Sequence, residues 1–530
     1  EAMPDQSQPT APNTENTFVC GCGEGVRSAC KGEEFFKEHE GKRYCVLHYP
    51  GTDKLEAFRA IMKRKLDAKD FDFRSVWFPE EADFSNVEFS AYVDLSNATF
   101  SAYANFERAT FSADAKFERA TFNANAYFER ATFSAYTYFN SATFKAEADF
   151  IEATFSANAY FYSATFSAEA NFRSATFSAK ANFWSATFSA EGGFPNATFN
   201  AEAEFDSTTF NAEADFYSAT FNTEVGFNSA TFNAKAGFNS ATFNAKAGFN
   251  NATCNADADF YNATFNADAD FYYATFYANA DFSNATFKNY VSFAGSNEER
   301  FLGKEPRLDF QFTHIEKPER VSFHTLSLKP HWFINADCRK FELTDCDWNF
   351  DLKEELEGAS EAKISAPHRL LSIAYRQLAD NAEANHRYHE ASRFRYNAFE
   401  ARRIEKFWGF VPWRLDWWYW LASGYGERVL QAFVVFVALF ALFAFGYTKV
   451  GFDQSSKAAT TNAAATQPDT VGKPLGMTEA IIYSAYVSIL QKPEPKPLTP
   501  AAKSLVWLET ILGPAQAALL ALAVRRRFMR

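Results

Sequence analysis

Five side chains near the beginning of the sequence are of types that bind transition metals. Residues 18–50 contain Cys20, Cys22, Cys30, Cys45 and His48. Thiolates and an imidazole at such separations can close a tetrahedral structural zinc site, and Cys-x2-His is a common half-site. Five candidates compete for four places, so we expect one of them to be a bystander. Structural zinc is the leading interpretation, because a bound metal can stabilise a small segment that has little hydrophobic core. The alternatives are unligated thiols and a redox or catalytic role.

A second group of polar residues lies near the end of the chain, inside a strongly apolar region. Residues 476–490 have a moderately apolar helical pattern that is short for a membrane span, and a stretch with alternating prolines follows. This order is typical of a re-entrant helix whose irregular tail lines a watery cavity. Our candidate pore residues are Tyr483, Ser484, Ser488, Gln491, Glu494, Glu509 and Gly513.

Two apolar runs flank this short helix. The first, from Val429 to about Tyr447, carries no charge, and the second, from Leu505 to Val524, carries one ionisable residue, Glu509. Each is long enough to span a bilayer. Lys and Arg crowd the outer end of both runs, so the positive-inside rule predicts that both ends lie in the cytoplasm. A carboxylate within a span is a functional candidate by default; the alternative is that Glu509 braces the re-entrant helix.

The order of span, re-entrant helix, irregular loop and span resembles the two-transmembrane pore module of potassium-type channels. Ala480–Ser488 resembles the pore helix of that module, and residues 508–513 resemble its lining helix. The resemblance implies a homotetramer in which four chains form one pore for permeant ions. The filter sequence Thr-Val-Gly-Tyr-Gly is absent, and Ser488 to Pro495 stand in its place. We therefore expect altered or low selectivity, set by Gln491, Glu494 or Glu509.

The central part of the chain is an eleven-residue repeat. From Phe73 to Phe293, large apolar residues recur in alternating steps of five and six, and only Leu95 and Cys254 replace Phe. Such fixed-period similarity is the signature of a solenoid. The pattern is similar to that of the pentapeptide-repeat family, which implies a right-handed four-sided β-helix. The additional residue in every second step predicts coils of 22 residues, ten of them here, in a rod of roughly 48 Å.

Composition excludes some functions. The net charge of −13 argues against nucleic-acid binding through phosphate contacts, although an acidic rod could instead imitate DNA. The sequence has no phosphate-binding Gly-rich loop, no Gly-x-Ser-x-Gly and no His-Glu-x-x-His, so we expect no enzymatic activity. Residues 1–17 are polar and rich in Pro and Thr, which predicts a flexible tail rather than a secretory signal.

Shorter segments connect these regions. Residues 53–68 have helical spacing and are expected to cap the first coil, and the solenoid pattern returns at Phe323 with a pure step of five. In that step Cys338 and Cys346 are expected to point into the coil. Residues 365–405 resemble a tetratricopeptide-type helical hairpin. Five tryptophans between Trp408 and Trp420 predict a collar at the membrane interface.

The expected fold class is a β-solenoid followed by an α-helical hairpin and a two-span helical membrane domain. We expect an oligomeric ion channel, multi-pass in the inner (plasma) membrane, with the β-helix in the cytoplasm for assembly, sensing or gating. The alternative is a membrane-anchored β-helical scaffold that recruits a partner and conducts nothing. The expected segments are a tail (1–17), a zinc segment (18–52), a capping helix (53–69), the β-helix (70–294), a loop and terminal coil (295–358), the hairpin (364–406), the interfacial helix (408–426), the first span (427–447), an external linker (448–474), the re-entrant segment (475–500), the second span (502–525) and a basic tail (526–530).

Overall fold

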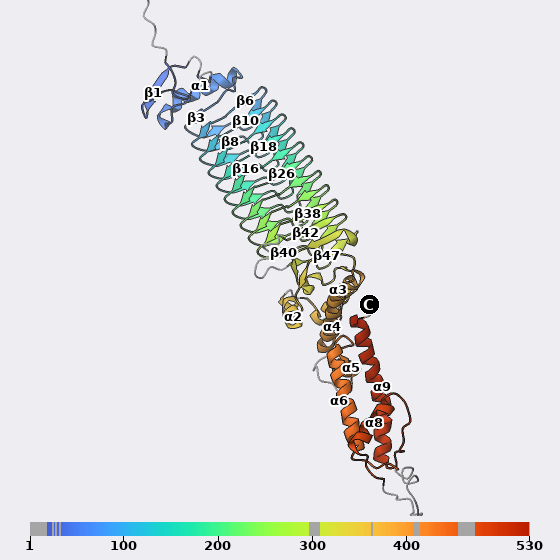
Figure 1. The fold of residues 1–530 in the computed structure, drawn as a ribbon. Helices are drawn as coiled ribbons and strands as arrows, with labels where there is room; N and C mark the ends of the chain where they lie inside the picture. Colours follow the sequence, from blue (N-terminus) through green and yellow to red (C-terminus); the bar gives the residue numbers. More distant parts are fainter. Residues whose placement is uncertain are drawn as a thin grey trace, which may run out of the picture. The chain divides into compact units, whose positions relative to one another are not determined.

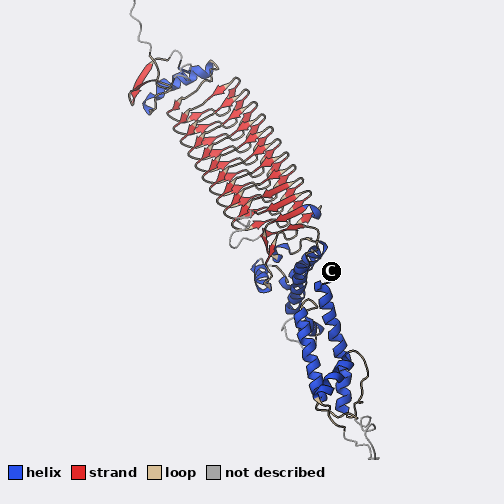
Figure 2. Ribbon diagram, in the orientation of Figure 1, coloured by secondary structure: helices blue, strands red, loops and turns tan. Residues whose placement is uncertain are grey.

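A computed structural model of the chain describes residues 18–23, 26, 29–30, 33–295, 308–361, 364–405, 414–453 and 472–528. It divides into two compact units, one made of Glu1–Ser327 and Phe341–Asp347 and the other of Leu328–Lys340 and Trp348–Arg530. Strands fill the first unit and helices fill most of the second, as Figures 1 and 2 show. The expected tail, residues 1–17, and most of the expected external linker, residues 454–471, lie outside the described residues.

The first unit is a β-solenoid of about 12 turns. Its strands, mostly two residues long, form four parallel sheets of 10, 11, 11 and 12 strands. The expected four-sided solenoid is therefore confirmed. The sheets run from β3 (Trp77–Phe78) to β39 (Thr275–Phe276), from β4 (Ala82–Asp83) to β43 (Leu308–Asp309), from β5 (Glu88–Phe89) to β44 (His314–Ile315), and from β6 (Val93–Asp94) through β38 (Ala269–Tyr272), β42 (Val291–Ala294) and β45 (Val321–His324) to β47 (Glu342–Thr344).

The coil length follows from the strand register. Thr121 pairs with Thr143 and Phe122 with Phe144, a step of 22 residues that recurs along the four sheets. Two eleven-residue repeats therefore make one coil, as the sequence predicts. The same step places side-chain amides in a ladder on the surface, where Asn222 Nδ2 donates to Asn200 Oδ1 at 2.8 Å and Asn244 Nδ2 to Asn222 Oδ1 at 2.7 Å.

Columns of phenylalanine fill the interior. Rings that are 22 residues apart stack face to face, for example Phe100 on Phe122 with centroids 4.7 Å apart, and rings of adjacent columns meet edge to face, for example Phe117 and Phe128 at 5.5 Å. Alanine stands two positions before most rings, and these alanines, such as Ala104, are buried. Their small side chains leave the interior to the rings, and such aromatic pairs add about 0.5–1.5 kcal/mol each beyond burial.

Every second corner uses a left-handed residue. The second residue after each large apolar residue of two of the four columns has a φ near +55°, as at Arg108 (φ 53°) in one and Ser163 (φ 51°) in the other. The N–H of Arg108 nevertheless donates to Glu129 O of the next coil at 2.8 Å. The corner therefore turns sharply without interrupting the backbone hydrogen bonds between coils, which offset the cost of an αL residue that is not glycine.

A small segment covers the first coil. It contains an antiparallel hairpin, β1 (Phe35–His39) and β2 (Lys42–Cys45), the short 3-10 helix η2 (Thr52–Lys54) and helix α1 (Leu55–Asp67). The Phe58 ring of α1 meets Phe78 of the first coil edge to face, with centroids 5.6 Å apart. The helix expected over residues 53–68 is thus present and shields the open end of the ring columns, which would otherwise face water.

The solenoid extends further than its sequence pattern indicates. The sequence predicts a lapse over residues 295–320, but β43 and β44 continue two sheets there. Ala280 pairs with Leu308, so a 28-residue step replaces the usual step and hides the repeat. After it, Phe323 pairs with Leu343, a step of 20 residues that agrees with the predicted step of five on this side of the solenoid.

The two late cysteines and the segment between these coils differ from the expectation. Residues Pro330–Phe333 form the 3-10 helix η4 rather than a solenoid strand. Cys346 is only half-buried, and Cys338, although buried, lies with its sulfur 3.8 Å from Gln377 Oε1 of a helix in its own unit. A proline at the start of η4 removes a backbone donor that a parallel strand requires, which accounts for the departure.

The helices of the second unit include a hairpin and two apolar helices. The expected hairpin is present as α3 and α4, with its break at residues 385–387, whereas α2 was not expected from the sequence pattern. Of the expected tryptophan collar, Trp408 and Trp413 lie outside the described residues, and α5 carries Trp417, Trp418 and Trp420. The helices are α2 (Leu352–Glu361), α3 (Pro367–Ala384), α4 (Tyr388–Glu405), α5 (Leu415–Ser423), α6 (Val429–Tyr447), α8 (Met477–Ser488) and α9 (Pro500–Phe528).

Helices α6 and α9 are each long and apolar enough to cross a membrane. Only 17% of the most apolar window of either helix is buried within the chain. Most of their apolar side chains are therefore exposed or half-buried, whereas the core helix of a soluble domain buries its apolar face. The two helices thus suggest that the chain associates with a membrane.

Candidate functional site

Helix α8 is packed between α6 and α9 by one apolar face. Ala480, Tyr483 and Val487 recur at helical spacing and are buried in a cluster with Tyr447 of α6 and Ala502 of α9. The helix has 12 residues and ends before Leu490, which has a φ of 61°. The prolines that follow lack the backbone donors that would extend a helix, so the chain from 489 to 499 is irregular. Figure 1 shows α8 beside one end of α6 and α9.

Glu509 of α9 joins the three helices through hydroxyl groups. Its carboxylate is fully buried and accepts hydrogen bonds from Tyr447 Oη of α6 and Ser484 Oγ of α8. Ser488 Oγ donates to the same carboxylate at 3.2 Å. A buried carboxylate is tolerated when donors such as these satisfy its oxygens. Of the two roles that the sequence leaves open for Glu509, the geometry favours the brace.

Gly513 allows α8 and α9 to approach closely. A methyl group at Gly513 would lie 3.1 Å from Ser488 Oγ and 3.4 Å from Ser488 Cα. The glycine therefore permits the contact that brings Ser488 to Glu509, one turn earlier on α9. Pro514 follows inside the helix. These contacts place small and polar residues, rather than large apolar ones, at the crossing of the two helices.

The predicted pore residues separate into two sets. Tyr483, Ser484, Glu509 and Gly513 are buried within the chain and Ser488 is half-buried, all of them at the junction of α6, α8 and α9. Gln491 and Glu494 are exposed in the proline-rich loop. These two residues and Glu479 line a cavity of about 420 Å³ between α8 and the loop.

Sequence reasoning missed Tyr447, although it supplies one of the three donors to Glu509. The sequence marks Tyr447 only by its position. It is the last residue of an apolar helix and brings a hydroxyl to that end of the helix. Nothing in the spacing of the sequence connects Tyr447 with a carboxylate 62 residues later. The pairing depends on how α6 and α9 pack, which the linear pattern does not determine.

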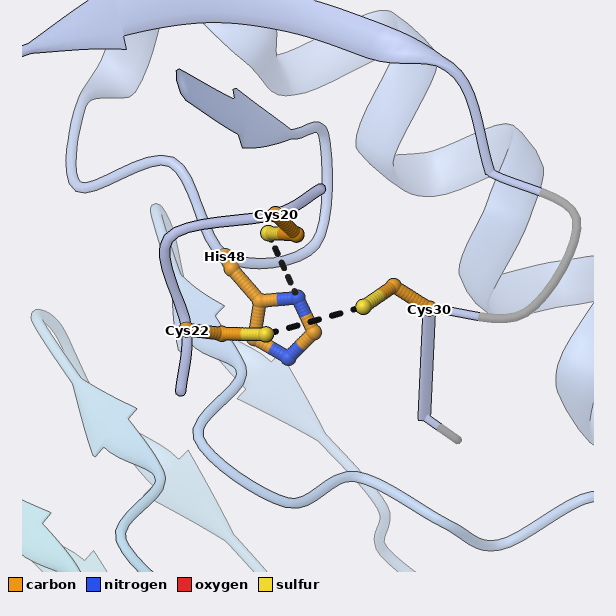
Figure 3. Close-up of side chains that lie close together, drawn as sticks. All are labelled: Cys20, Cys22, Cys30 and His48. Atoms are coloured by element: carbon orange, nitrogen blue, oxygen red, sulfur yellow. Dashed lines mark hydrogen bonds between the residues drawn. The ribbon is translucent and has the colours of Figure 1, made fainter. Parts of the chain in front are cut away.

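The N-terminal thiols and imidazole converge, as Figure 3 shows. The ligand atoms of Cys20, Cys22, Cys30 and His48 all lie within 4.8 Å of one another. Cys22 Sγ lies 3.6 Å from Cys30 Sγ, and Cys20 Sγ lies 3.8 Å from His48 Nδ1. Edges of this length match a tetrahedral site with metal–sulfur bonds of about 2.3 Å. The fifth candidate is also close, because Cys45 Sγ lies 3.0 Å from His48 Nδ1.

The contacts of His48 prepare one ring nitrogen for a metal. Its Nε2 lies 2.9 Å from Arg74 O, and since a carbonyl only accepts, Nε2 carries the proton. Nδ1 therefore faces the sulfur atoms. Such a second contact commonly fixes the tautomer of a metal-binding histidine. The side chains of His48, Cys20 and Cys45 are buried and those of Cys22 and Cys30 are half-buried, so the group is partly shielded from water.

Without a metal the group holds few negative charges. The pKa of Cys20 is lowered by its side-chain hydrogen bonds with Cys22, Cys30 and Cys45. The same hydrogen bond to Cys20 raises the pKa of Cys22 to about 12 and raises that of Cys45. One thiolate is thus stabilised by its protonated neighbours. A divalent cation is the kind of ligand that would let several of these thiols ionise together.

Comparison with known proteins concerns the solenoid. No curated protein and no solved structure shows significant similarity to this chain. The family described as pentapeptide repeats, in nine copies, matches residues 95–143, 139–187 and 249–297. The described residues of all three stretches lie within the coils of stacked phenylalanines. The β-solenoid of this chain therefore contains pentapeptide repeats over these residues.

Proposed function

We propose that the chain is one subunit of an oligomeric membrane ion channel with a cytoplasmic β-solenoid. The observation that carries this proposal is the packing of the short helix α8, followed by an irregular loop, between two long apolar helices. Two helices that served only to anchor a rod would need no third helix between them. The proposal includes no enzymatic activity and no contact with nucleic acid.

The length of α8 supports a re-entrant position. Its 12 residues extend about 18 Å, well short of the roughly 30 Å of a bilayer core. Irregular backbone is tolerated at membrane depth only where protein buries it or water reaches it. The loop from 489 to 499 supports such a position, because its residues Gln491 and Glu494 line a cavity that water could reach. In this proposal the loop lines the aqueous path.

Oligomerisation follows from the number of helices. Three helices of one chain pack against each other without enclosing a channel, so a pore requires several copies. The outward faces of α6 and α9 carry exposed apolar side chains, such as Phe433 and Trp507, which lipid or neighbouring subunits would cover. The resemblance to two-transmembrane channels favours four copies, and we propose a homotetramer.

Selectivity would depend on the loop. Because Glu509 is bonded by hydroxyls inside its own subunit, it is not available to a central pore. The exposed Glu494 and Gln491 are the polar groups that remain from the predicted pore residues. A ring of Glu494 side chains would favour cations weakly, because carboxylate rings attract cations without replacing their hydration shells.

The proposed orientation is multi-pass in the inner membrane. Arg428 precedes α6, and Arg525 to Arg527 end α9, so positive charge lies at the same end of both helices. The positive-inside rule assigns this end to the cytoplasm. The solenoid and the C-terminus are then cytoplasmic as well.

For the N-terminal segment we propose a structural zinc ion. The support is the donor set of Cys20, Cys22, Cys30 and His48, whose ligand atoms lie within 4.8 Å of one another. Zinc held there would tie together the segment that precedes the first coil, where the described residues form a two-stranded hairpin, the 3-10 helix η2 and helix α1. Cys45, beside His48, is the alternative fourth ligand.

A second candidate function is a membrane-anchored interaction scaffold. It is favoured by the internal satisfaction of Glu509, which gives that residue a purely structural role, and by the extended solenoid faces. In this alternative α8 stabilises the anchor, and the solenoid recruits a partner protein. The two functions differ in whether the reconstituted protein passes ions.

The test is ion flux through proteoliposomes, measured with the full chain and with its subunit number determined in the same detergent. The channel proposal expects a discrete oligomer and flux above that of empty liposomes. A monomer whose liposomes remain tight would contradict the channel and leave the scaffold. Detergent-stable tetramers without flux under any tested ion gradient would also count against conduction.

A further inference from the structure

A cavity of about 530 Å³ lies where α4, the start of α6 and the end of α9 meet. Figure 1 shows the C-terminal end of α9 beside α4. Arg393 and Tyr396 of α4, Arg428 before α6, and Arg526 and Arg527 of α9 are among the residues that line it. Cavities of this size are typical of small-ligand sites. The pore proposal assigns no role to this cavity.

The cavity carries an excess of positive charge. Four arginines line it, against a single carboxylate, Glu427. That carboxylate is buried and already has its partners, since Arg395 Nε and Arg526 Nη1 each donate to its Oε1 at 2.9 Å. Ser392 Oγ donates to its Oε2 at 2.7 Å. Glu427 therefore holds the walls together, and its charge does not neutralise the other arginines.

Two of these arginines are held by aromatic rings. The guanidinium of Arg393 lies 3.7 Å from the ring centre of Phe350, and that of Arg428 lies 4.1 Å from the ring centre of Tyr396. Within the described part of the chain, neither forms an ion pair. Ring stacking orients a guanidinium and leaves its N–H donors free for a planar or tetrahedral anion. The site is thus preorganised for a ligand with several anionic oxygens.

The position of the cavity indicates what that ligand is. Arg428 is the N-cap of α6, and Arg526 and Arg527 lie in the last turn of α9, so the cavity lies at the polar end of both apolar helices. If these helices cross a bilayer, the cavity lies at the level of the lipid headgroups, where basic pockets attract anionic lipids. We infer that this cavity binds the phosphate of an anionic phospholipid headgroup. The inference depends on the proposed membrane insertion but not on conduction.

A bound phosphate would connect the soluble and apolar helices. Arg393 belongs to the helical hairpin, whereas Arg428 and Arg527 belong to the ends of the apolar helices. Charge-assisted hydrogen bonds from both sides to one phosphate would fix the hairpin against the membrane surface. The lipid composition of the membrane would then influence how firmly α4 is held.

The test is lipid binding to the full chain in detergent micelles, measured by native mass spectrometry. Phosphatidylglycerol and phosphatidylcholine are added separately, and glycerol phosphate serves as a soluble source of the same group. We expect phosphatidylglycerol to bind at least tenfold more tightly to the wild type than to Arg393→Gln/Arg428→Gln. Effective competition by millimolar glycerol phosphate would instead identify a soluble phosphate ligand and overturn the lipid assignment.

A matched control separates the cavity from general surface charge. Arg376→Gln/Arg402→Gln removes two exposed arginines from the same hairpin, outside the cavity, and is expected to change binding less than twofold. The single variant Arg393→Gln changes an exposed residue and can be measured even if the double variant misfolds. We expect it to bind phosphatidylglycerol three- to fivefold more weakly than the wild type. Equal binding by the wild type and the cavity variants, or no preference for phosphatidylglycerol over phosphatidylcholine, would overturn the inference.

Discussion

Ser484 Oγ of α8 donates a hydrogen bond to the buried carboxylate of Glu509 of α9. This contact fixes the short helix to the second apolar helix. Tyr447 adds a donor from the first apolar helix. The three helices are thus joined by one acceptor group, and the arrangement of the proposed pore domain depends on it.

Glu509→Leu is therefore expected to destabilise the helical unit. The substitution leaves the hydroxyls of Tyr447 and Ser484 buried without an acceptor, at a cost of about 1–3 kcal/mol for each unpaired group. Thermal unfolding of the full chain in detergent measures the effect. Thr510→Ala changes the adjacent, exposed residue and is the control. An unchanged midpoint for Glu509→Leu would contradict the bracing role.

The inward rings carry the stability of the solenoid. Phe161→Ala removes a fully buried ring that stacks on Phe139 and Phe183 at 4.9 and 4.7 Å, and we expect a loss of about 3–5 kcal/mol. Its neighbour Tyr162 is exposed and stacks on Trp184, so Tyr162→Ala is expected to cost well under about 1 kcal/mol. Hydrogen exchange of the amides from 139 to 183 measures the loss of protection in each of the two variants. Similar losses of protection in both variants would refute the assigned orientation.

Buried Lys54 gives the capping segment a pH dependence. Its Nζ donates to Leu47 O at 2.9 Å and lies 4.7 Å from the Phe58 ring centre, and burial lowers its pKa to about 7. Between about pH 7 and 10.5 the unfolded chain binds the additional proton. Stability therefore rises with pH across this window, by up to about 1.4 kcal/mol per pH unit, and the cost of the buried charge is complete below pH 7.

Hydrogen exchange of the α1 amides as a function of pH, corrected for intrinsic exchange rates, checks this dependence. Lys54→Met should remove the slope that the wild type shows, because methionine fills a similar volume without a titrating group. Any contribution of the nearby thiols is the same in both proteins and cancels in the comparison. A wild-type slope that persists unchanged in Lys54→Met would show that another group causes it.

The zinc proposal predicts metal content. The purified wild type is expected to hold about one zinc per chain, and Cys22→Ser, Cys30→Ser and His48→Ala to hold much less. Cys45→Ser distinguishes the bystander, because it retains zinc if Cys20, Cys22, Cys30 and His48 are the ligands. Cys254→Ser is the control. This thiol is buried inside the solenoid, away from the four proposed ligands, and burial raises its pKa to about 12. Absence of zinc from the wild type, or equal content in every variant, would reject the site.

The sequence predicts the solenoid well because one local rule repeats. Each Phe must point inward and each preceding Ala must be small, so the ring columns and the 22-residue register follow from spacing alone. The prediction fails where the spacing changes. The 28-residue step before Leu308 conceals two continuing strands, and Pro330 starts a 3-10 helix where a strand is expected.

The candidate sites were predictable in residue type but not in pairing. The thiols and His48 share a short segment, so their convergence follows from proximity along the chain. Tyr447 and Glu509 lie far apart along the chain, and Arg393 and Arg428 of the basic cavity lie on different helical segments. These contacts depend on the packing of helices that are distant in sequence, and amphipathic patterns alone do not specify such packing.

The central claim is that assembled copies of α6, α8 and α9 enclose an aqueous path. The most direct test is the current across a planar bilayer that contains the purified full chain, with the reversal potential measured in a KCl gradient. We predict discrete currents with weak cation preference, and a shift of the reversal potential toward that of chloride in Glu494→Lys. Bilayers that stay silent with verified, correctly assembled protein would contradict the channel, as would a reversal potential that does not change in the Glu494 variant.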